Sequence, residues 1–154
     1  MLEIKKHNEK ILHKKTRAIE DINNEIKKLV DFMVKAMYQN QGVGLAANQI
    51  GLDLCMAVVD AGNGLKILIN PKIIKTKGQI LDDEGCLSLP GVFLKIKRPQ
   101  FVEVEAFDKN GRSIKIKARD LEARAICHEV DHLNGKLITD RVGLIKKLRY
   151  KVGI

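Results

Sequence analysis

One short pattern, His-Glu-x-x-His, limits what this chain can fold into more than any other feature of its sequence. It is formed by His128, Glu129 and His132. Residues four apart lie one above the other on one face of an α-helix, so both imidazoles can point at a single metal ion. The pattern therefore needs a helix, and the flanking residues predict one that begins after Asp120 as the N-cap and ends at Gly135 as the C′ residue.

Chance is the alternative explanation, because two histidines on an amphipathic helix often only pack or face solvent. The pattern gains weight here because the chain has four histidines, and two of them occupy these positions. Glu129 directly follows the first histidine, where its carboxylate can reach a water molecule on the metal and act as a general base. We therefore interpret this helix as a candidate metal-binding element.

The third candidate ligand is Cys86, in the segment 83–91, which interrupts a pattern of strands and is predicted to be a loop. Alone, it would be interpreted as a loop cysteine of no consequence. Together with two imidazoles, its thiolate makes a three-ligand set with a fourth position free for water, which is the open coordination of a catalytic metal. Such a metal lowers the pKa of its water toward neutrality, so the sequence predicts metal-assisted hydrolysis of an amide or ester.

A glycine- and alanine-rich segment, 41–51, lets the backbone approach a ligand closely. The Gly-Lys-Ser/Thr end of a phosphate loop is absent, and no strand precedes the glycines as a dinucleotide site would need. We interpret the segment as a tight substrate wall carrying one amide side chain, Gln49; an ordinary helix-to-strand connection is the alternative. The Gln49 amide and the backbone N–H of Leu87 are the candidate donors to the oxyanion of a tetrahedral intermediate.

The remaining patterns predict an α+β fold in one domain over 1–154. Spacings of three and four predict an amphipathic helix with Asp21 as its cap, ending near Asn40. Aliphatic runs predict strands at 54–59 and 65–69, with a break at Pro71, and a hairpin formed by 101–107 and 112–118. A polar N-terminal arm at 1–20, an extended stretch at 136–139 and a basic tail at 140–154, predicted to be helical, complete the chain.

The expected architecture is therefore antiparallel strands packed around a central helix that carries the His-Glu-x-x-His pattern. An N-terminal amphipathic helix and a short C-terminal helix flank this unit. Alternation in the hairpin places its valines and isoleucines in the core, whereas its glutamates and lysines pair across the solvent-facing side.

Composition narrows the class of protein further. A net charge of +9 predicts attraction to polyanions, but 4% aromatic residues and no tryptophan leave little material for stacking on bases. Three cysteines without the spacing of a disulfide framework favour a reducing compartment. No apolar run approaches the roughly 20 residues that span a bilayer. We expect no membrane partner and a cytoplasmic location, or an organelle if a targeting segment has been removed.

Three segments together resemble the peptide deformylase family. Residues 42–49 (GVGLAANQ) resemble its first motif, GxGLAAxQ; residues 84–88 (EGCLS) resemble its second; and residues 128–132 (HEVDH) resemble its third, HExDH. The motifs occur in the family's order, and the resemblance covers about residues 20–141. It implies removal of the formyl group from the N-formylmethionine of nascent polypeptides, with release of formate.

The resemblance also implies a role for each motif residue. The metal ligands are Cys86, His128 and His132, with Glu129 as base and acid, Gln49 and the Leu87 N–H as oxyanion donors, and Val43, Gly44, Glu84 and Gly85 as substrate-binding residues. The metal is one divalent ion, Fe(II) in most members, and Zn, Ni or Co is able to replace it. Glu84 is expected to pair with Arg98, and Asp131 to help orient the helix. Nascent formylmethionyl peptides are the expected partners of a monomer, with the basic tail contacting the ribosome.

Two other functions compete with this interpretation. A zinc endopeptidase also uses His-Glu-x-x-His but takes its third ligand from downstream, and no His or Cys follows His132. A basic ribosome-binding domain with a vestigial metal site would not need Glu129 or Gln49. One departure from the family is Cys127, which precedes the first histidine where the family has Gln. One position along a helix turns a side chain by about 100°, so Cys127 is not expected to be a ligand.

Overall fold

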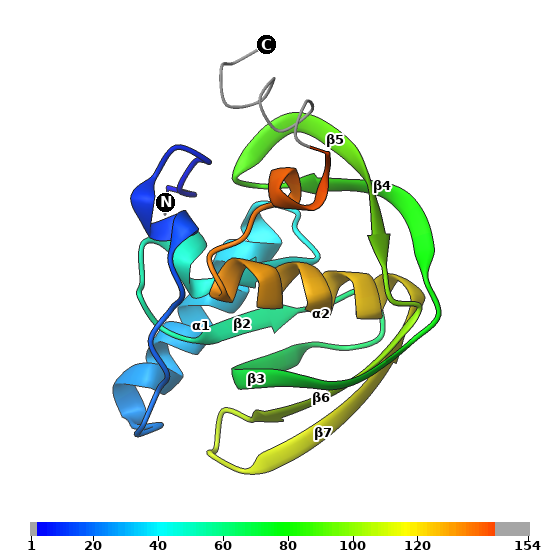
Figure 1. Cartoon of the computed structure of the whole chain (residues 1–154). Coiled ribbons are helices and arrows are strands. Elements are labelled where there is room, and N and C mark those ends of the chain that lie inside the picture. Colours follow the sequence, from blue (N-terminus) through cyan, green and yellow to red (C-terminus); the bar gives the residue numbers. More distant parts are fainter. Residues whose placement is uncertain (1–2, 144–154) are drawn as a thin grey trace.

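The computed structural model describes residues 3–143, and its strands form two antiparallel sheets (Figure 1). The larger sheet has the strand order β1-β2-β3-β6-β7 and the smaller one is the pair β4-β5. The antiparallel α+β character predicted from the sequence is confirmed. The strand bounds are β1 Gly44–Ala46, β2 Met56–Val59, β3 Lys66–Lys77, β4 Ile80–Cys86, β5 Leu89–Arg98, β6 Phe101–Phe107 and β7 Ser113–Arg119.

The β6–β7 hairpin forms as its alternation predicts. Val102 and Val104 on β6 are fully buried, and Val104 lies opposite the buried Ile116 of β7. On the other side of the hairpin, Glu103 lies opposite Lys117. Because successive side chains of a strand point to opposite faces, the side chains on one face of this hairpin form part of the hydrophobic core and those on the other face solvent.

Two α-helices, α1 Asn24–Gln39 and α2 Asp120–Leu133, accompany the sheets, with short 3-10 helices at Lys10–His13, Ala47–Ile50 and Ile138–Arg141. The predicted caps are wrong by one or two residues. The α1 cap is Asn23, whose Oδ1 accepts a hydrogen bond at 3.0 Å from the N–H of Ile26, the third residue of the helix. In α2, Asp120 is the first helical residue and makes no side-chain cap.

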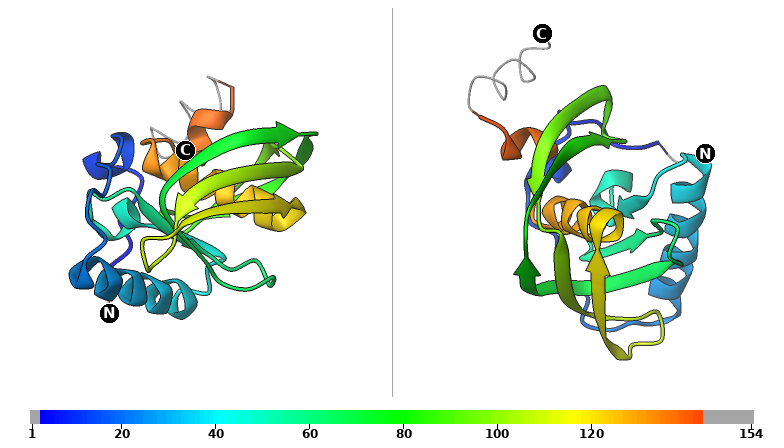
Figure 2. Two further views of the ribbon diagram at one scale, coloured as in Figure 1. Left: turned by 90° about the horizontal axis from the view of Figure 1, so that it is seen from below. Right: turned by 90° about the vertical axis from the view of Figure 1, so that its right-hand side faces the viewer.

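Helix α2 contacts both sheets. It lies against β1, β2, β6 and β7 of the larger sheet and β5 of the smaller one, and the right view of Figure 2 shows strands on more than one side of it. Eleven of its fourteen residues are buried, including both histidines of the His-Glu-x-x-His pattern. Among residues 3–143, no helix has the length and apolar character that crossing a membrane requires.

Three predicted segment boundaries differ from the structure. Strand β3 continues through Pro71 instead of breaking there, with a register shift between Ile69 and Lys72 that accommodates the missing N–H of proline. Segment 83–91 is not a loop but the meeting of β4 and β5. Its strand pattern is hidden because the charged Glu84 is buried whereas the apolar Leu81 of the same strand is exposed. The stretch predicted to be extended ends in the 3-10 helix Ile138–Arg141, and the C-terminal helix predicted within 140–154 lies outside the described residues from 144 on.

The N-terminal arm is tied to the segments that carry the site. Leu12 is fully buried, and the Lys5 N–H donates to the Gln49 carbonyl at 2.7 Å. Both the N–H and the hydroxyl of Thr16 donate to the carbonyl of Leu133, the last residue of α2, at 2.9 Å. The arm therefore braces the end of the helix that carries His132.

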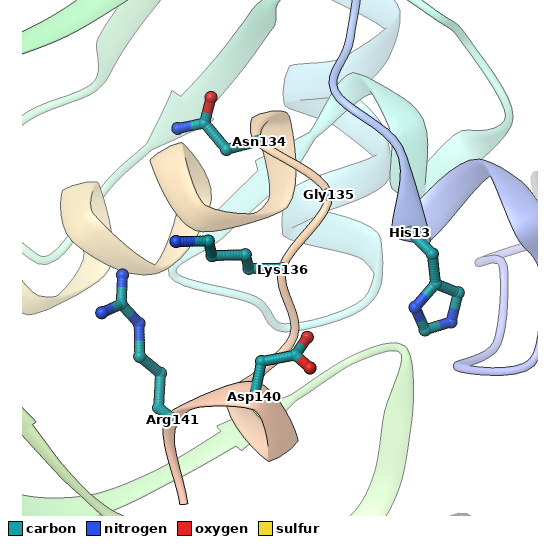
Figure 3. A pocket seen from close by; sticks show the side chains of 6 residues that line it. All are labelled: His13, Asn134, Gly135, Lys136, Asp140 and Arg141. Atoms are coloured by element: carbon teal, nitrogen blue, oxygen red, sulfur yellow. The ribbon is translucent and has the colours of Figure 1, made fainter.

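Gly135 ends α2 as predicted, and we expect its replacement by alanine to destabilise the fold. Its φ is +75°, and a Cβ there would lie 2.7 Å from the backbone of Lys14 (Figure 3 shows Gly135 between α2 and His13). Backbone strain alone costs about 1–3 kcal/mol, and this backbone contact adds to it. The measurement is urea unfolding. Gly62→Ala is the matched control, because φ is +93° there but nothing lies within 4 Å; equal losses in the two variants would contradict the role of the contact.

Candidate metal centre

The three predicted ligands come together although Cys86 lies more than forty residues from the histidines. Cys86 is the last residue of β4, and its Sγ lies 3.3 Å from Nε2 of His132. The Nε2 atoms of His132 and His128 are 3.1 Å apart. Within the described part of the chain, this is the one group of three or more candidate ligands whose donor atoms all lie within 4.8 Å of one another.

This donor set fits one divalent metal ion. A thiolate and two imidazoles are the ligands of borderline metals, and three donor atoms this close together can all bind one ion. Burial lowers the pKa of His132 well below its usual value and so favours the neutral imidazole that binds metals. Cys127 lies in the hydrophobic core beside Ile126, where burial raises its pKa to about 11, and it is not in the ligand group.

His128 is held in place from behind by Glu84. Its Nδ1 lies 2.7 Å from Oε2 of Glu84, which leaves Nε2 facing the other ligands. Burial favours the neutral form of Glu84, but the hydrogen bonds from His128 and Arg98 prevail and hold its pKa well below its usual range. A carboxylate here must accept the Nδ1 proton, so Glu84 fixes both the tautomer and the orientation of His128.

A buried ionic cluster extends from Glu84 beneath the ligands. Arg98 donates to Glu84 from Nε at 3.1 Å and from Nη2 at 2.7 Å, as the sequence analysis expects. Arg98 also donates from Nη1 to Asp131 at 2.6 Å, which ties β5 to α2. Sequence reasoning missed Arg124, which donates to Glu84 at 3.0 Å, and Arg141, which donates from Nε to Asp131 at 2.8 Å.

Glu129 is buried next to the ligands, and one of its two carboxylate oxygens has no hydrogen-bond partner among the described residues. The residue is 4% exposed, and its Oε2 has no hydrogen-bond partner among the described residues. Burial raises the pKa of Glu129 to about 7. A divalent cation nearby would lower that pKa again, so the residue suits either direction of proton transfer near neutral pH.

Because Gly44 has no side chain, the carboxylate of Glu129 can lie directly against its backbone. A Cβ at Gly44 would lie 2.5 Å from Oε1 of Glu129 and 2.9 Å from its Cγ. We expect Gly44→Ala to displace the Glu129 carboxylate and to lower kcat by about 10²-fold, because misplacement of a catalytic group by about 1 Å costs that much. Release of formate, which the sequence resemblance implies as the product, measures the effect. Gly42→Ala is the milder control, since its Cβ would first meet the end of the Leu87 side chain at 3.1 Å. Unchanged turnover in Gly44→Ala would contradict this prediction.

The predicted oxyanion donors lie beside the ligands. The Ala46 N–H donates to Oε1 of Gln49 at 2.9 Å, which turns Nε2 toward the Ser88 hydroxyl at 3.2 Å and the Cys86 sulfur at 3.8 Å. Leu87 is in the turn between β4 and β5. Sequence reasoning missed the fully buried Ser88 and also Asn48, whose Nδ2 donates to the carbonyl of His132 at 2.6 Å. Both lie within the quoted motifs, but nothing in their spacing shows what they contact.

The site opens into a cleft of about 650 Å³. Cys86, His128 and Glu129 reach its wall, whereas His132 is 1% exposed and lies behind them. The cleft runs between the edge strand β1 and the start of the β4–β5 turn. All four residues predicted to bind substrate line it: Val43, Gly44, Glu84 and Gly85.

A hydrolase that uses a metal needs ligands that leave the ion accessible and a base on the same side as the substrate. Both are found on the wall of this cleft, and the chain therefore falls in the class of metal-dependent hydrolases. Comparisons with known proteins narrow the class. The profile of the polypeptide deformylase family matches residues 1–148, and this chain belongs to that family.

Individual relatives agree with this assignment. The peptide deformylase of Caldanaerobacter subterraneus subsp. tengcongensis is 47% identical over 139 residues, covering 90% of this chain and 87% of that protein. The peptide deformylase of Thermodesulfovibrio yellowstonii is 44% identical over 152 residues, covering 96% and 92%. The crystal structure of the Ehrlichia chaffeensis peptide deformylase in complex with actinonin matches with a TM-score of 0.92 at 35% identity, covering 100% of this chain and 99% of that one.

The family assignment establishes the reaction. The protein is a metal-dependent hydrolase that removes the N-formyl group from N-formylmethionyl nascent polypeptides and releases formate. The endopeptidase and the non-enzymatic ribosome-binding domain are thereby excluded as its primary function. The fold matches that of the family, with antiparallel sheets and two α-helices.

Proposed function

We propose that the deformylation reaction takes place at the centre formed by Cys86, His128 and His132, with Fe(II) as the ion in the cell. The closeness of the three donor atoms is the observation that carries this proposal. One thiolate and two imidazoles also suit Zn, Ni or Co. When bound, the ion supplies Lewis acidity, which lowers the pKa of a water molecule toward neutrality and polarises the formyl carbonyl.

Glu129 acts as the general base and then as the general acid in this proposal. Its carboxylate takes the proton of the attacking water and later delivers a proton to the leaving amine of methionine. Its burial and the pKa of about 7 support both roles, because the carboxyl changes protonation state at little cost near neutral pH. The lack of a partner for Oε2 among the described residues leaves that oxygen available for the water.

Gln49 and the backbone N–H of Leu87 stabilise the developing oxyanion in the proposed mechanism. The Ala46 N–H holds the Gln49 amide so that its NH₂ group, rather than its carbonyl, faces the Cys86 sulfur. A donor fixed in advance costs no reorganisation when the negative charge develops, and one such donor contributes about 10²–10³-fold in rate.

The nascent peptide binds between β1 and β4, with Val43, Gly44, Glu84 and Gly85 along its path. Strand β1 is the last strand of its sheet and, among the strands of residues 3–143, pairs only with β2, so its other edge offers backbone groups to an added peptide strand. Glu84 takes part through its backbone, because its side chain is engaged by Arg98, Arg124 and His128.

The finer organisation of the protein belongs to the same proposal. We place α2 at the centre of the fold, supported by its contacts with both sheets. We also propose that the protein is a single catalytic domain that acts as a monomer in the cytoplasm; the three candidate ligands of one ion lie together within this chain. The basic tail, 140–154, is proposed to contact the ribosome through its arginines and lysines; from residue 144 on it lies outside the described residues.

Metal analysis of ligand variants tests the proposal. We expect about one divalent ion per chain in the anaerobically purified protein. Metal affinity should fall by at least about 10-fold in Cys86→Ala, His128→Ala and His132→Ala. All three variants should also lose formate release. Cys127→Ala is the matched control, because that thiol is buried away from the ligand group, and it should keep its metal. Metal retained in Cys86→Ala would overturn the ligand assignment.

Inhibition gives an independent readout. Peptide deformylases from Ehrlichia chaffeensis and Synechococcus elongatus have been crystallised in complex with actinonin. We expect actinonin to inhibit formate release by this protein and to protect the metal from a chelator. Protection without inhibition would indicate that it binds outside the reacting centre.

A further inference from the structure

The outer face of β3, β6 and β7 carries three cross-strand rows with cations at both ends. In each row a residue of β6 lies between a cation of β3 and a cation of β7. The rows are Lys72–Glu105–Lys115, Lys75–Glu103–Lys117 and Lys77–Phe101–Arg119. We call these nine residues the basic face. Its six cations are all exposed, and with two carboxylates its net charge is +4.

The charges of the basic face are poorly compensated. Within residues 3–143, only Lys117 of the six cations has a carboxylate within 4.0 Å, and that contact, to Glu103, is 3.7 Å long. Lys77 and Arg119 instead lie over the ring of Phe101, at 5.8 Å and 5.0 Å from its centroid. Cations that have no carboxylate nearby repel one another. The approach of a polyanion therefore lowers the electrostatic free energy of this face.

The basic face is open and turned away from the catalytic cleft. The opposite side of the same strands carries Val102, Val104 and Ile116, which form the core against α2. In the left view of Figure 2, no helix of the described chain crosses the outer side of β6 and β7. A partner bound to the basic face would therefore leave the cleft accessible to substrate.

We propose that the basic face is a docking surface for the phosphate backbone of RNA. Residues two apart along a strand are about 6.7 Å apart and neighbouring strands about 4.8 Å, so the six cations form a ladder that can contact several successive phosphates. The cation-flanked Phe101 ring offers a stacking surface of the kind that single-stranded RNA uses. The substrate of the enzyme emerges from the ribosome, an RNA-rich particle, so a polyanionic RNA surface lies where the enzyme works.

A membrane surface fits the basic face less well. Binding in a lipid interface uses an apolar face that enters the boundary beside the charges. The one apolar side chain among the nine residues is Phe101, which is only partly exposed. This inference goes beyond deformylation and does not depend on the assignment of the metal ligands.

The experiment compares two variants with the same change in net charge. The first replaces Lys72, Lys75, Lys115 and Lys117 on the basic face with Gln. The second, the matched control, replaces four exposed lysines of the N-terminal arm and α1, Lys10, Lys15, Lys28 and Lys35, with Gln. The metal-loaded proteins are titrated with a labelled single-stranded RNA of about 20 nucleotides at several salt concentrations.

We expect the first variant to bind RNA at least about 10-fold more weakly at 100 mM salt, with the slope of log K against log salt smaller by about 3. The control should change affinity by less than about 3-fold. Formate release from a short formyl-Met peptide should be unchanged in both, which separates this inference from the proposed catalytic roles. Equal losses in both variants would show that net charge alone is responsible, and no loss in either would overturn the docking surface.

Vesicles with anionic headgroups and a polyglutamate peptide complete the test. We expect RNA to compete with both for the protein, and the variant of the basic face to lose RNA binding more than it loses binding to either. If vesicles or polyglutamate bind more tightly than RNA through the same four lysines, the assignment of RNA as the partner is wrong.

Discussion

Replacing Glu129 with alanine is expected to lower kcat for a formyl-Met dipeptide by about 10³- to 10⁴-fold while the protein keeps its metal. General acid–base catalysis contributes up to about 10⁴-fold, and Glu129 serves in both proton transfers of the proposed mechanism. Its carboxylate has no ligand role in the Cys86, His128 and His132 group, so its loss should not empty the site. The measurements are formate release and metal content on the same preparations.

A conservative variant separates proton transfer from packing. Glu129→Gln keeps the volume beside Gly44, where the Glu129 side chain fills the space that a Cβ would need. It should lose nearly as much turnover as the alanine variant, because an amide cannot take a proton from water. Glu20→Ala, at an exposed position outside the cleft, should keep full activity. Normal turnover in Glu129→Gln would remove this residue from the mechanism.

The site was predictable where its chemistry is encoded in local spacing. Helical geometry alone brings His128 and His132 together, so their pairing follows from a separation of four residues. Cys86 is different, because it reaches the histidines only through the β4–β5 pairing. The sequence offered it as a candidate through the chemistry of the thiol and the resemblance of its motif, and the geometry agrees with that expectation.

The surroundings of the site could not be predicted in the same way. The sequence predicts a loop at 83–91, where β4 ends and β5 begins, because Asp83, Glu84 and Gly85 do not alternate as a half-buried strand does. Nothing in the spacing of Arg124 indicates its partners, yet it is 9% exposed and donates to Glu84 and to two backbone carbonyls. Buried charges break the hydrophobic patterns on which sequence interpretation depends, and their partners in this cluster lie 10 to 44 residues away along the chain.

The same buried charges make Glu84→Gln the variant with the largest expected effect on stability. The carboxylate accepts hydrogen bonds from Arg98 and Arg124 and holds His128. An amide of the same size leaves the buried guanidinium group of Arg124 without its counter-ion and leaves Arg98 paired with Asp131 alone. Breaking a buried ion pair from one side costs about 3–5 kcal/mol. For a domain of this size, we expect Tm to fall by about 6–20 °C.

The metal should respond as well as the fold, because Glu84 orients a ligand. Loss of a carboxylate behind a ligating histidine typically lowers metal affinity by about 10- to 100-fold, so competition with a chelator should detect the effect of Glu84→Gln even under conditions where the chain stays folded.

Asp83→Asn is the matched control. It removes the neighbouring carboxylate, whose contact with Lys95 is at the surface, and should change the free energy of unfolding by less than about 1 kcal/mol. If Glu84→Gln lowers Tm no further than Asp83→Asn, the buried cluster does not stabilise this fold. If it lowers Tm but leaves metal affinity unchanged, Glu84 is a structural counter-ion and His128 is held by the packing of α2 alone.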